Sequence, residues 1–145
     1  MKQAKDLSKE PPRSPRVRLR NYVILARTID KCRALLNGTI GEYHFDCPLD
    51  NILFGFENLK ADDFKNCVAS SENDDDIAFW VEESGIRKTD TEIQEWSAMV
   101  EGLRPYDDPE KREWFKSVCE PLGVNPATAT LFDWLEADDA ATFKK

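Results

Sequence analysis

The chain has 145 residues, of which 41% are hydrophobic and 10% aromatic, and its net charge at pH 7 is −8. This length fits one domain, and the composition excludes an intrinsically disordered chain, which would be poor in aromatic residues. No apolar run approaches the roughly 18 residues of a membrane helix, and the charged N-terminus lacks the apolar core of a secretory signal. We therefore expect a soluble cytoplasmic protein that does not bind a membrane.

The charge is unevenly distributed along the chain. Residues 1–36 carry ten basic and three acidic residues, a net charge of +7, whereas residues 37–145 carry ten basic and 25 acidic residues, a net charge of −15. An acidic body repels a phosphate backbone, so nucleic-acid binding is not expected. Two interpretations of the basic segment remain: it lies against the acidic body of its own chain, or it binds an external anionic partner.

The four cysteines are widely spaced and form no Cys-x-x-Cys pair (Cys32, Cys47, Cys67 and Cys119). All but Cys47 lie among apolar residues at helical spacing, where cysteine acts as a small hydrophobic residue. Disulfide frameworks are typical of shorter, secreted and cysteine-dense chains, so we expect free thiols. We also expect no metal and no cofactor, because a closed metal site needs four ligands and the sequence offers only His44 and Cys47 close together.

The first 20 residues predict an extended, proline-rich and basic arm. Pro11, Pro12 and Pro15 lack an N–H donor and disfavour helix at the residues before them, so residues 10–16 should be extended. We expect this arm to form one folding unit with a helical domain that covers residues 21–145.

The first helix is predicted over residues 21–36, where apolar residues recur three and four positions apart. Arg27, Asp30, Lys31 and Ala34 fall on the other side of this helix, which should face solvent. Gly38 is a suitable end for the helix. The stretch that follows, up to Asp46, has no helical period and predicts a loop or a short strand.

Six further short helices are predicted, each marked by a residue that favours a helix start or its cap. These residues are, in chain order, Pro48, Lys60 (a cap flanked by the hydrophobic staple of Leu59 and Phe64), Asn73, Thr89, Asp108 and Thr130. Gly85, Gly102 and Gly123 mark the ends of three of them. We expect Trp114 inside the domain and the acidic pair at residues 138 and 139 in solvent. The predicted fold class is all-α: a compact single domain of about seven short helices with an extended, proline-rich N-terminal arm.

Several unusual strings occur in a fixed order along the chain. They are DLSKEPPRSPR at residues 6–16, YVILAR at 22–27, GEYHF at 41–45, CPLD at 47–50, DPEKREWF at 108–115 and WLEADD at 134–139. With these strings the chain resembles, over nearly its whole length, a bacterial family known as domain of unknown function 5069. The resemblance implies a small helical protein, and it assigns no catalytic residue.

The densest group of reactive residues lies between Tyr43 and Asp50. With Pro48 at the first helical position, Cys47 becomes the N-cap, where the positive end of the helix dipole favours a nucleophilic thiolate. His44 lies three residues upstream as a candidate base, with Asp50 as a supporting group, which predicts a small cysteine-dependent enzyme. The alternative is structural: Cys47 is only a cap, Asp50 accepts from its backbone N–H, and His44 is a loop residue. A single cysteine and a single histidine without a family signature favour this alternative.

The arm supplies the candidate ligand-binding residues Arg13 and Arg16. Proline stiffens this segment, a guanidinium group suits a carboxylate or phosphate, and Tyr22 or Tyr43 could stack on a planar ligand. These features favour a small binding or interaction module for an anionic small molecule or protein partner. The alternative is that the same arginines fasten the arm to the acidic body. Exchange of the arm with a second copy would give a homodimer in place of a monomer.

Overall fold

The computed structural model describes residues 3–144. Seven α-helices and two short 3₁₀ helices lie in this range. Their bounds are α1 (Leu25–Asn37), α2 (Pro48–Glu57), α3 (Ala61–Ser70), α4 (Asp74–Ser84), α5 (Asp90–Glu101), η1 (Pro105–Asp107), α6 (Arg112–Cys119), η2 (Glu120–Leu122) and α7 (Leu131–Thr142). The all-α prediction is confirmed. Residues 1 and 2 of the predicted arm, and residue 145, lie outside the described range. No described helix has the length and apolar character needed to cross a membrane.

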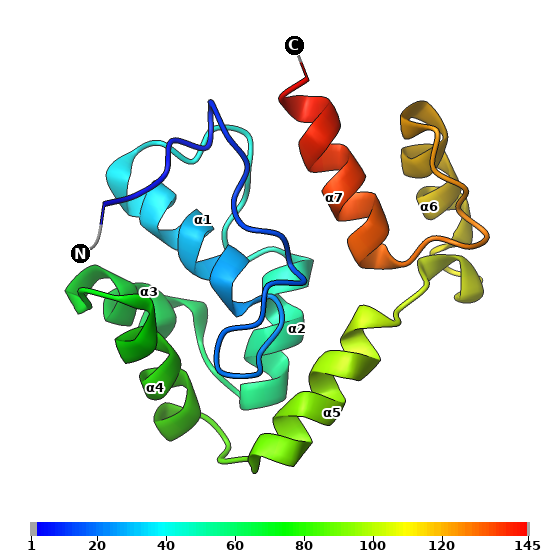
Figure 1. The fold of residues 1–145 in the computed structure, drawn as a ribbon. Helices are drawn as coiled ribbons and strands as arrows, with labels where there is room; N and C mark the ends of the chain where they lie inside the picture. Colours follow the sequence, from blue (N-terminus) through cyan, green and yellow to red (C-terminus); the bar gives the residue numbers. More distant parts are fainter. Residues whose placement is uncertain (1–2, 145) are drawn as a thin grey trace.

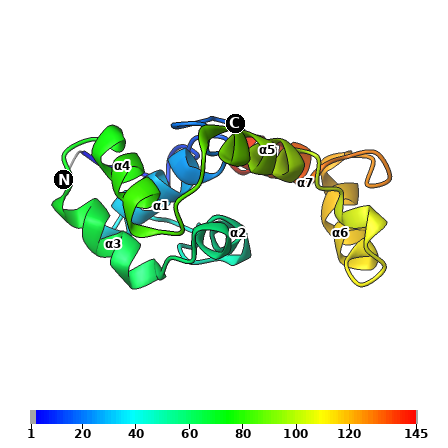
Figure 2. The same cartoon turned by 90° about the horizontal axis from the view of Figure 1, so that it is seen from below.

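Helix α1 lies in one half of the molecule, in contact with α2, α3 and α4. The arm crosses over α1 before the chain enters it (Figure 1). Helix α5 then leads away from this group towards α6 and α7, which lie at the opposite end of the molecule from α3 and α4 (Figures 1 and 2). The chain thus forms a main body around α1 and a smaller unit of α6 and α7 attached to it.

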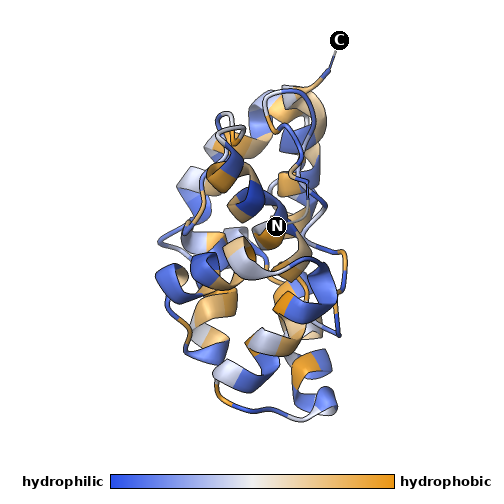
Figure 3. Cartoon of the chain, turned by 90° about the vertical axis from the view of Figure 1, so that its left-hand side faces the viewer, coloured by the Kyte–Doolittle hydropathy of each residue, from blue (hydrophilic) through white to orange (hydrophobic). Residues whose placement is uncertain are grey.

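The apolar side chains form two clusters of different size. The main cluster is built from α1 to α5 and includes Phe132 of α7, while the smaller one surrounds Phe115 and Cys119 of α6. Hydrophobic and hydrophilic residues alternate along the helices, as expected of amphipathic helices packed on one another (Figure 3). Helix α7 contributes to both clusters, because Phe132 packs into the main one and Trp134 into the smaller one.

The local helix signals are largely confirmed. Pro48 is the first residue of α2, and the Asn73 side chain accepts a hydrogen bond from the backbone N–H of the third helical residue of α4. Thr89 forms a capping box with Glu92 at the start of α5. Gly38 ends α1 in the left-handed conformation. Each of these signals depends on residues within one turn of one another, which is why sequence alone reveals them.

The predicted start of the first helix is wrong by four residues, because α1 begins at Leu25. The backbone before it turns through positive φ angles of 48° at Arg20, 71° at Asn21 and 73° at Ile24. A β-branched residue rarely adopts this conformation, which costs roughly 1–2 kcal/mol. The Ile24 N–H donates to the carbonyl of Pro15 at 2.9 Å, and Ile24 is fully buried. Packing and the contact with the arm therefore override local helix propensity here.

Two predictions in the C-terminal third are also corrected. Helix α6 begins at Arg112, since Asp108 forms a turn in which its carbonyl accepts from the N–H groups of Lys111 and Arg112. Trp114, expected inside the domain, is 44% exposed. Helix α7 extends from Leu131 to Thr142.

The side of α1 expected to face solvent is buried. Arg27 is 3% exposed, Asp30 5%, Lys31 3% and Ala34 0%, and Arg33 is buried beside them. The periodic apolar stripe of this helix is real, but the arm, α4, α7 and the segment before α2 cover the remaining faces. Burial of four charged side chains requires partners for each of them.

The first group of partners joins the arm to α1 and α4. The Arg13 guanidinium donates to both oxygens of Asp30 at 3.0 Å, and its Nη1 lies 2.8 Å from the Asp74 carboxylate. Arg33 Nη1 lies 2.7 Å from the other oxygen of Asp74. Burial opposes ionisation of Asp74, but the Arg13 and Arg33 guanidinium groups outweigh it and hold its pKa below the usual value. Two positive and two negative charges balance in this group.

Two smaller groups complete the set, and each is also neutral. Arg27 forms a bidentate ion pair with Asp139 of α7 at 2.7 and 3.0 Å, and the Tyr43 hydroxyl donates to the same carboxylate at 2.8 Å. Asp139 is therefore buried, contrary to its predicted solvation. Lys31 pairs with Asp50 of α2 at 2.9 Å. We call these three sets the α1 ion groups.

The α1 ion groups predict that neighbouring acidic residues of α7 differ greatly in their effect on stability. Asp139→Asn leaves the Arg27 guanidinium buried without a counter-charge and should cost about 3–5 kcal/mol. Asp138→Asn removes an exposed carboxylate and should change stability by no more than about 0.5 kcal/mol. Urea unfolding of both variants measures these differences. Equal, small losses in the two variants would contradict the structural role given to Asp139.

Candidate functional site

The basic arm binds the body of its own chain through each of its four arginines. Arg13 joins the first α1 ion group, while Arg16 donates to Glu136 at 2.8 Å and pairs with Asp133, both on α7. Arg18 pairs with Glu101, and Arg20 pairs with Glu82 at 3.1 Å. Every predicted anion-binding arginine thus has a carboxylate partner. An external anion would have to displace these carboxylates to bind there.

The two predicted stacking residues are both engaged inside the protein. Tyr22 is buried, and its hydroxyl donates to Glu57 at 2.6 Å. Tyr43 is half-buried, with its ring stacked on Phe143 at a centroid distance of 6.4 Å and beneath the Arg27 guanidinium. Burial, with the neighbouring carboxylates, raises the pKa of both tyrosines. Neither ring presents an open face next to Arg13 or Arg16.

Glu57 is a buried acidic residue of the main body that is only partly satisfied. It is fully buried, and only one of its carboxylate oxygens accepts a hydrogen bond, from Tyr22. Its other oxygen lies against Gly85, where an added Cβ would approach to 2.6 Å. Burial raises the pKa of Glu57, and the hydrogen bond from Tyr22 offsets this only in part. Glycine is required at position 85 because this carboxylate and the backbone of Glu57 fill the space of a side chain.

Cys47, at the end of the segment before α2, lies close to Lys31 of α1 and Asp50 of α2. Cys47 is the N-cap of α2, but its thiol makes no capping hydrogen bond. Instead, Lys31 Nζ lies 3.2 Å from Cys47 Sγ and 2.9 Å from Asp50 Oδ1. Thr28 donates to Asp50 Oδ1 at 2.7 Å, and the N–H of Asp46, not that of Cys47, donates to Asp50 Oδ2 at 3.0 Å. The thiol is thus held beside a buried ammonium group.

His44 does not join this arrangement. Along this segment Tyr43 and Phe45 are half-buried, whereas His44 and Asp46 are exposed. Phe45 packs against the rings of Phe54 and Phe64, which turns the residue before it outward. Within residues 3–144, His44 makes no side-chain hydrogen bond or ion pair. Its exposed position agrees with the loop interpretation, and no contact positions it as a base for Cys47.

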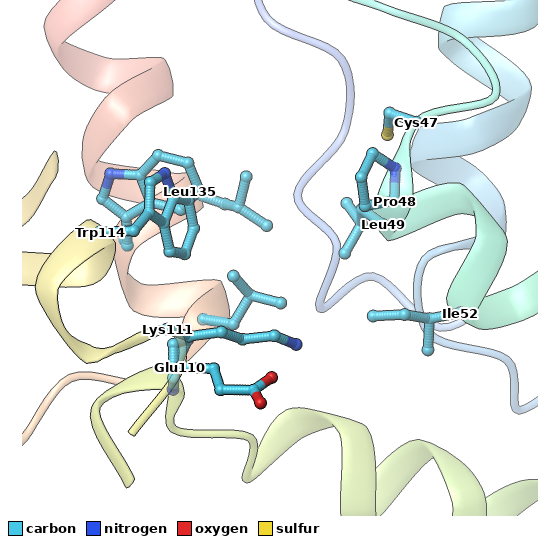
Figure 4. Close-up of a pocket in the computed structure, with 11 residues that line it drawn as sticks. Cys47, Pro48, Leu49, Ile52, Glu110, Lys111, Trp114 and Leu135 are labelled. Carbon is cyan, nitrogen blue, oxygen red and sulfur yellow. The ribbon is translucent and has the colours of Figure 1, made fainter. Parts of the chain in front are cut away.

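A cleft of about 530 Å³ opens beside Cys47. Its first wall is the start of α2, with Cys47, Pro48, Leu49 and Ile52 (Figure 4). Its second wall comes from η1, α6 and α7 and consists of Pro105, Glu110, Lys111, Trp114, Leu131, Trp134 and Leu135. The two walls face each other across open space in Figure 4, with Cys47 at one end of the α2 wall. Among the lining side chains, Cys47, Glu110, Lys111 and the two tryptophans carry polar atoms, and the indole nitrogen of Trp134 is buried.

The chain was compared with known proteins. The model of a family described as a domain of unknown function, DUF5069, matches residues 9–141. The chain belongs to the DUF5069 family. The resemblance seen in its sequence is therefore confirmed, whereas a search of the curated proteins finds none that matches the chain. The family assignment names no ligand or reaction, so function has to be argued from the site of this DUF5069 chain.

Of the predicted site residues, the structure brings Cys47 and Asp50 together and leaves His44, Arg13, Arg16 and Tyr22 elsewhere. Within residues 3–144, no three histidine, cysteine or acidic side chains are grouped as metal ligands would be.

The sequence-based prediction missed Lys31 and the whole second wall of the cleft. A signal for Lys31 exists, because α1 carries apolar residues on more than one side (Ala26 and Ala34 beside the main stripe), which indicates a helix buried all round. A lysine in such a helix needs a buried acidic partner. No comparable signal marks Trp114, whose helical spacing is the same as that of a core residue.

The four thiols should react in a definite order with iodoacetamide at pH 8. Burial raises the pKa of Cys32 to about 12 and also raises the pKa of Cys67 and Cys119, which disfavours their thiolates. Cys47 is half-buried at the cleft and accepts a hydrogen bond from Lys31, so we expect it to be alkylated first. Peptide mass spectrometry over time gives the order. Cys67 is the matched comparison because it is also half-buried; equal rates for the two would contradict the proposed reactivity of Cys47.

Glu57 should make stability fall as pH rises. Its folded-state pKa lies above the ordinary value of 4.5, so the folded state binds its proton more tightly than the unfolded state. The resulting stabilisation is complete below pH 4.5 and is lost as pH rises through the raised pKa. Glu57→Gln removes this titration while keeping an acceptor for Tyr22. The free energy of unfolding of the wild type, relative to that of Glu57→Gln, should therefore decrease from pH 4 upward, and a constant difference would contradict the assignment.

Proposed function

We propose that this DUF5069 chain is a binding module for an apolar organic molecule, which occupies the cleft between α2 and the α6–α7 unit. The observation that carries the proposal is the cleft itself: about 530 Å³ of space, lined mainly by apolar and aromatic side chains from two separate parts of the chain. Pockets for small organic molecules typically have volumes of about 300–1,000 Å³ and this kind of lining. The volume therefore suits a single molecule of that size.

The exposed indole of Trp114 supports this choice of ligand. It is 44% exposed and stands edge to face against Trp134, with a centroid distance of 5.3 Å. Leu135 and Leu131 of α7 and Ile52 of α2 add aliphatic surface. Burial of apolar area contributes about 25 cal/mol per Å², so a ligand that covers these side chains gains affinity without any charged contact. Glu110 and Lys111 provide the polar atoms at the edge of the second wall.

The proposal places the ligand in the cleft and not on the arm. Arg13 and Arg16 remain candidates for binding an anionic molecule or protein partner, but each already holds carboxylates of its own chain. Binding an anion there would trade one set of ion pairs for another, whereas binding in the cleft replaces only water. This difference in cost favours the cleft. The arm is also bound to its own body, which supports a monomer over an arm-exchanged homodimer.

A second candidate function, a cysteine-dependent reaction, is favoured by one observation. Cys47 Sγ lies at the cleft and 3.2 Å from Lys31 Nζ, which is itself held by Asp50. In this function Cys47 is the nucleophile, Lys31 stabilises its thiolate, and Asp50 positions Lys31. His44 would serve as base only after movement of the exposed loop. We place the protein in the cytoplasm, since its free cysteines suit a reducing compartment.

Trp114→Ala tests the binding function. N-phenyl-1-naphthylamine, an uncharged dye that fluoresces in apolar sites, should bind the wild type with one site. Removal of the indole should weaken binding about tenfold or more, because truncation of a central aromatic residue in a binding site costs about 2 kcal/mol or more. Phe79→Ala is the matched control: Phe79 is 54% exposed on α4, far from the cleft residues, and its removal should leave affinity unchanged.

Fluorescence titration gives the dissociation constants of the wild type and the two variants, and circular dichroism with urea unfolding shows that each variant is folded. This check matters because partly unfolded proteins also bind apolar dyes. The proposed function would be overturned if the wild type did not bind the dye. It would also be overturned if Trp114→Ala and Phe79→Ala weakened dye binding equally. If the dye binds but iodoacetamide modification of Cys47 leaves its affinity unchanged, the ligand does not reach the thiol.

A further inference from the structure

Helix α7 forms ion pairs with one set of its residues and lines the cleft with another. Asp133, Glu136 and Asp139, spaced three residues apart, face the arm and α1. Leu131, Trp134 and Leu135 of the same helix line the cleft. Any displacement of α7 relative to the arm therefore moves one wall of the cleft relative to the wall formed by α2.

The arm holds α7 through Arg16. Its Nε donates to Glu136 at 2.8 Å, its Nη2 pairs with Asp133, and its guanidinium lies 5.9 Å from the centre of the Phe132 ring. Ser14 donates to the other oxygen of Glu136 at 2.8 Å. The backbone of the arm is fixed in turn, because Arg13 is held by Asp30 and Asp74 and the Pro15 carbonyl accepts from the N–H of Ile24. Arg16 thus joins a fixed segment to the cleft wall.

The two ionic attachments of α7 differ in their exposure to solvent. The side chains of Arg27 and Asp139 are 4% and 9% exposed, and their contact lies near the C-terminal end of the helix. The side chains of Arg16 and Glu136 are 35% and 41% exposed, and they hold the N-terminal half, where the cleft residues lie. Because exposed ion pairs are weak and sensitive to salt, the second attachment can be altered without unfolding the protein.

We infer that Arg16 is a positioning residue for the cleft: by holding Glu136 and Asp133, it fixes the distance of the α7 wall from the α2 wall and so determines ligand affinity. This inference rests on the proposed binding function, which it extends from the site to the element that shapes it. Arg16 does not contact the ligand. Its effect reaches the site through Leu131, Trp134 and Leu135, which move with α7.

The test compares Arg16→Ala with Arg18→Ala. Both variants remove one positive charge of the arm from a half-exposed position: Arg16→Ala removes the pairs with Glu136 and Asp133, and Arg18→Ala removes the pair with Glu101 of α5, where the Arg18 side chain is 37% exposed. Only Arg16 contacts the cleft-lining helix. N-phenyl-1-naphthylamine should bind Arg16→Ala about fivefold more weakly than the wild type, a typical coupling between two sites, and Arg18→Ala should bind like the wild type. Glu136→Gln should weaken binding in the same direction as Arg16→Ala.

Two further measurements separate positioning from a general loss of structure. In 1 M NaCl the affinities of the wild type and Arg16→Ala should converge, because salt screens the exposed pair within about 3 Å. The rate of alkylation of Cys47 by iodoacetamide, which requires no ligand, should change in Arg16→Ala and not in Arg18→Ala. Urea unfolding of the two arginine variants shows whether their stabilities are comparable.

Each outcome assigns failure to one proposal. If the dye binds the wild type and depends on Trp114, but Arg16→Ala and Arg18→Ala have equal affinities and equal Cys47 alkylation rates, the positioning role of Arg16 is wrong and the binding function stands. If no Trp114-dependent binding occurs, the binding function fails. In that case, a change in Cys47 alkylation confined to Arg16→Ala still shows that Arg16 holds the α7 wall, whereas unchanged alkylation overturns both proposals.

Discussion

Charged side chains that leave water need partners of opposite sign, and α1 carries Arg27, Asp30, Lys31 and Arg33 into the interior. Their partners come from four different elements: Arg13 from the arm, Asp50 from α2, Asp74 from α4 and Asp139 from α7. Apolar contacts tolerate sliding and rotation, whereas a bidentate ion pair permits one geometry. The charges of α1 therefore fix how these four elements sit relative to one another, and the rest of the structure depends on that arrangement.

The division of the sequence into a basic start and an acidic remainder follows from the same constraint. Arginines of the arm and of α1, together with Lys31, pair mostly with carboxylates that lie after residue 49. A charge distribution that suggested an anionic partner is thus largely used within the chain. Each α1 ion group is neutral, which lets charges of both signs be buried together. The excess negative charge remains on the outer surfaces of the later helices.

The parts of this fold that sequence predicts are those encoded within one or two helical turns, such as the Thr89–Glu92 capping box and the Pro48 helix start. Sequence alone does not predict the buried face of α1, because a charged residue on a helix is usually exposed. The partner that allows Arg27 to be buried, Asp139, lies 112 residues away in the chain. Trp114 was misjudged for the opposite reason. Its spacing is that of a core residue, but the surface it would cover, at the start of α2, stays separated from it by the cleft. Periodicity reports which side of a helix is apolar, and it carries no information about what covers that side.

The existence of an open cleft follows from how the α6–α7 unit is attached. Its small cluster around Phe115 and Cys119 is complete without the main body, and α7 joins the main cluster through Phe132, with Leu131 and Leu135 packed against that cluster. A second, ionic attachment is made by Asp133, Glu136 and Asp139 on another side of α7. Covering both walls would bury more apolar surface, but any movement of α7 that separated Asp139 from Arg27 would leave both charges buried and unpaired, at a cost of about 3–5 kcal/mol. The ion pairs thus oppose movement of α7, and a ligand of suitable size can cover both walls without disturbing the charges.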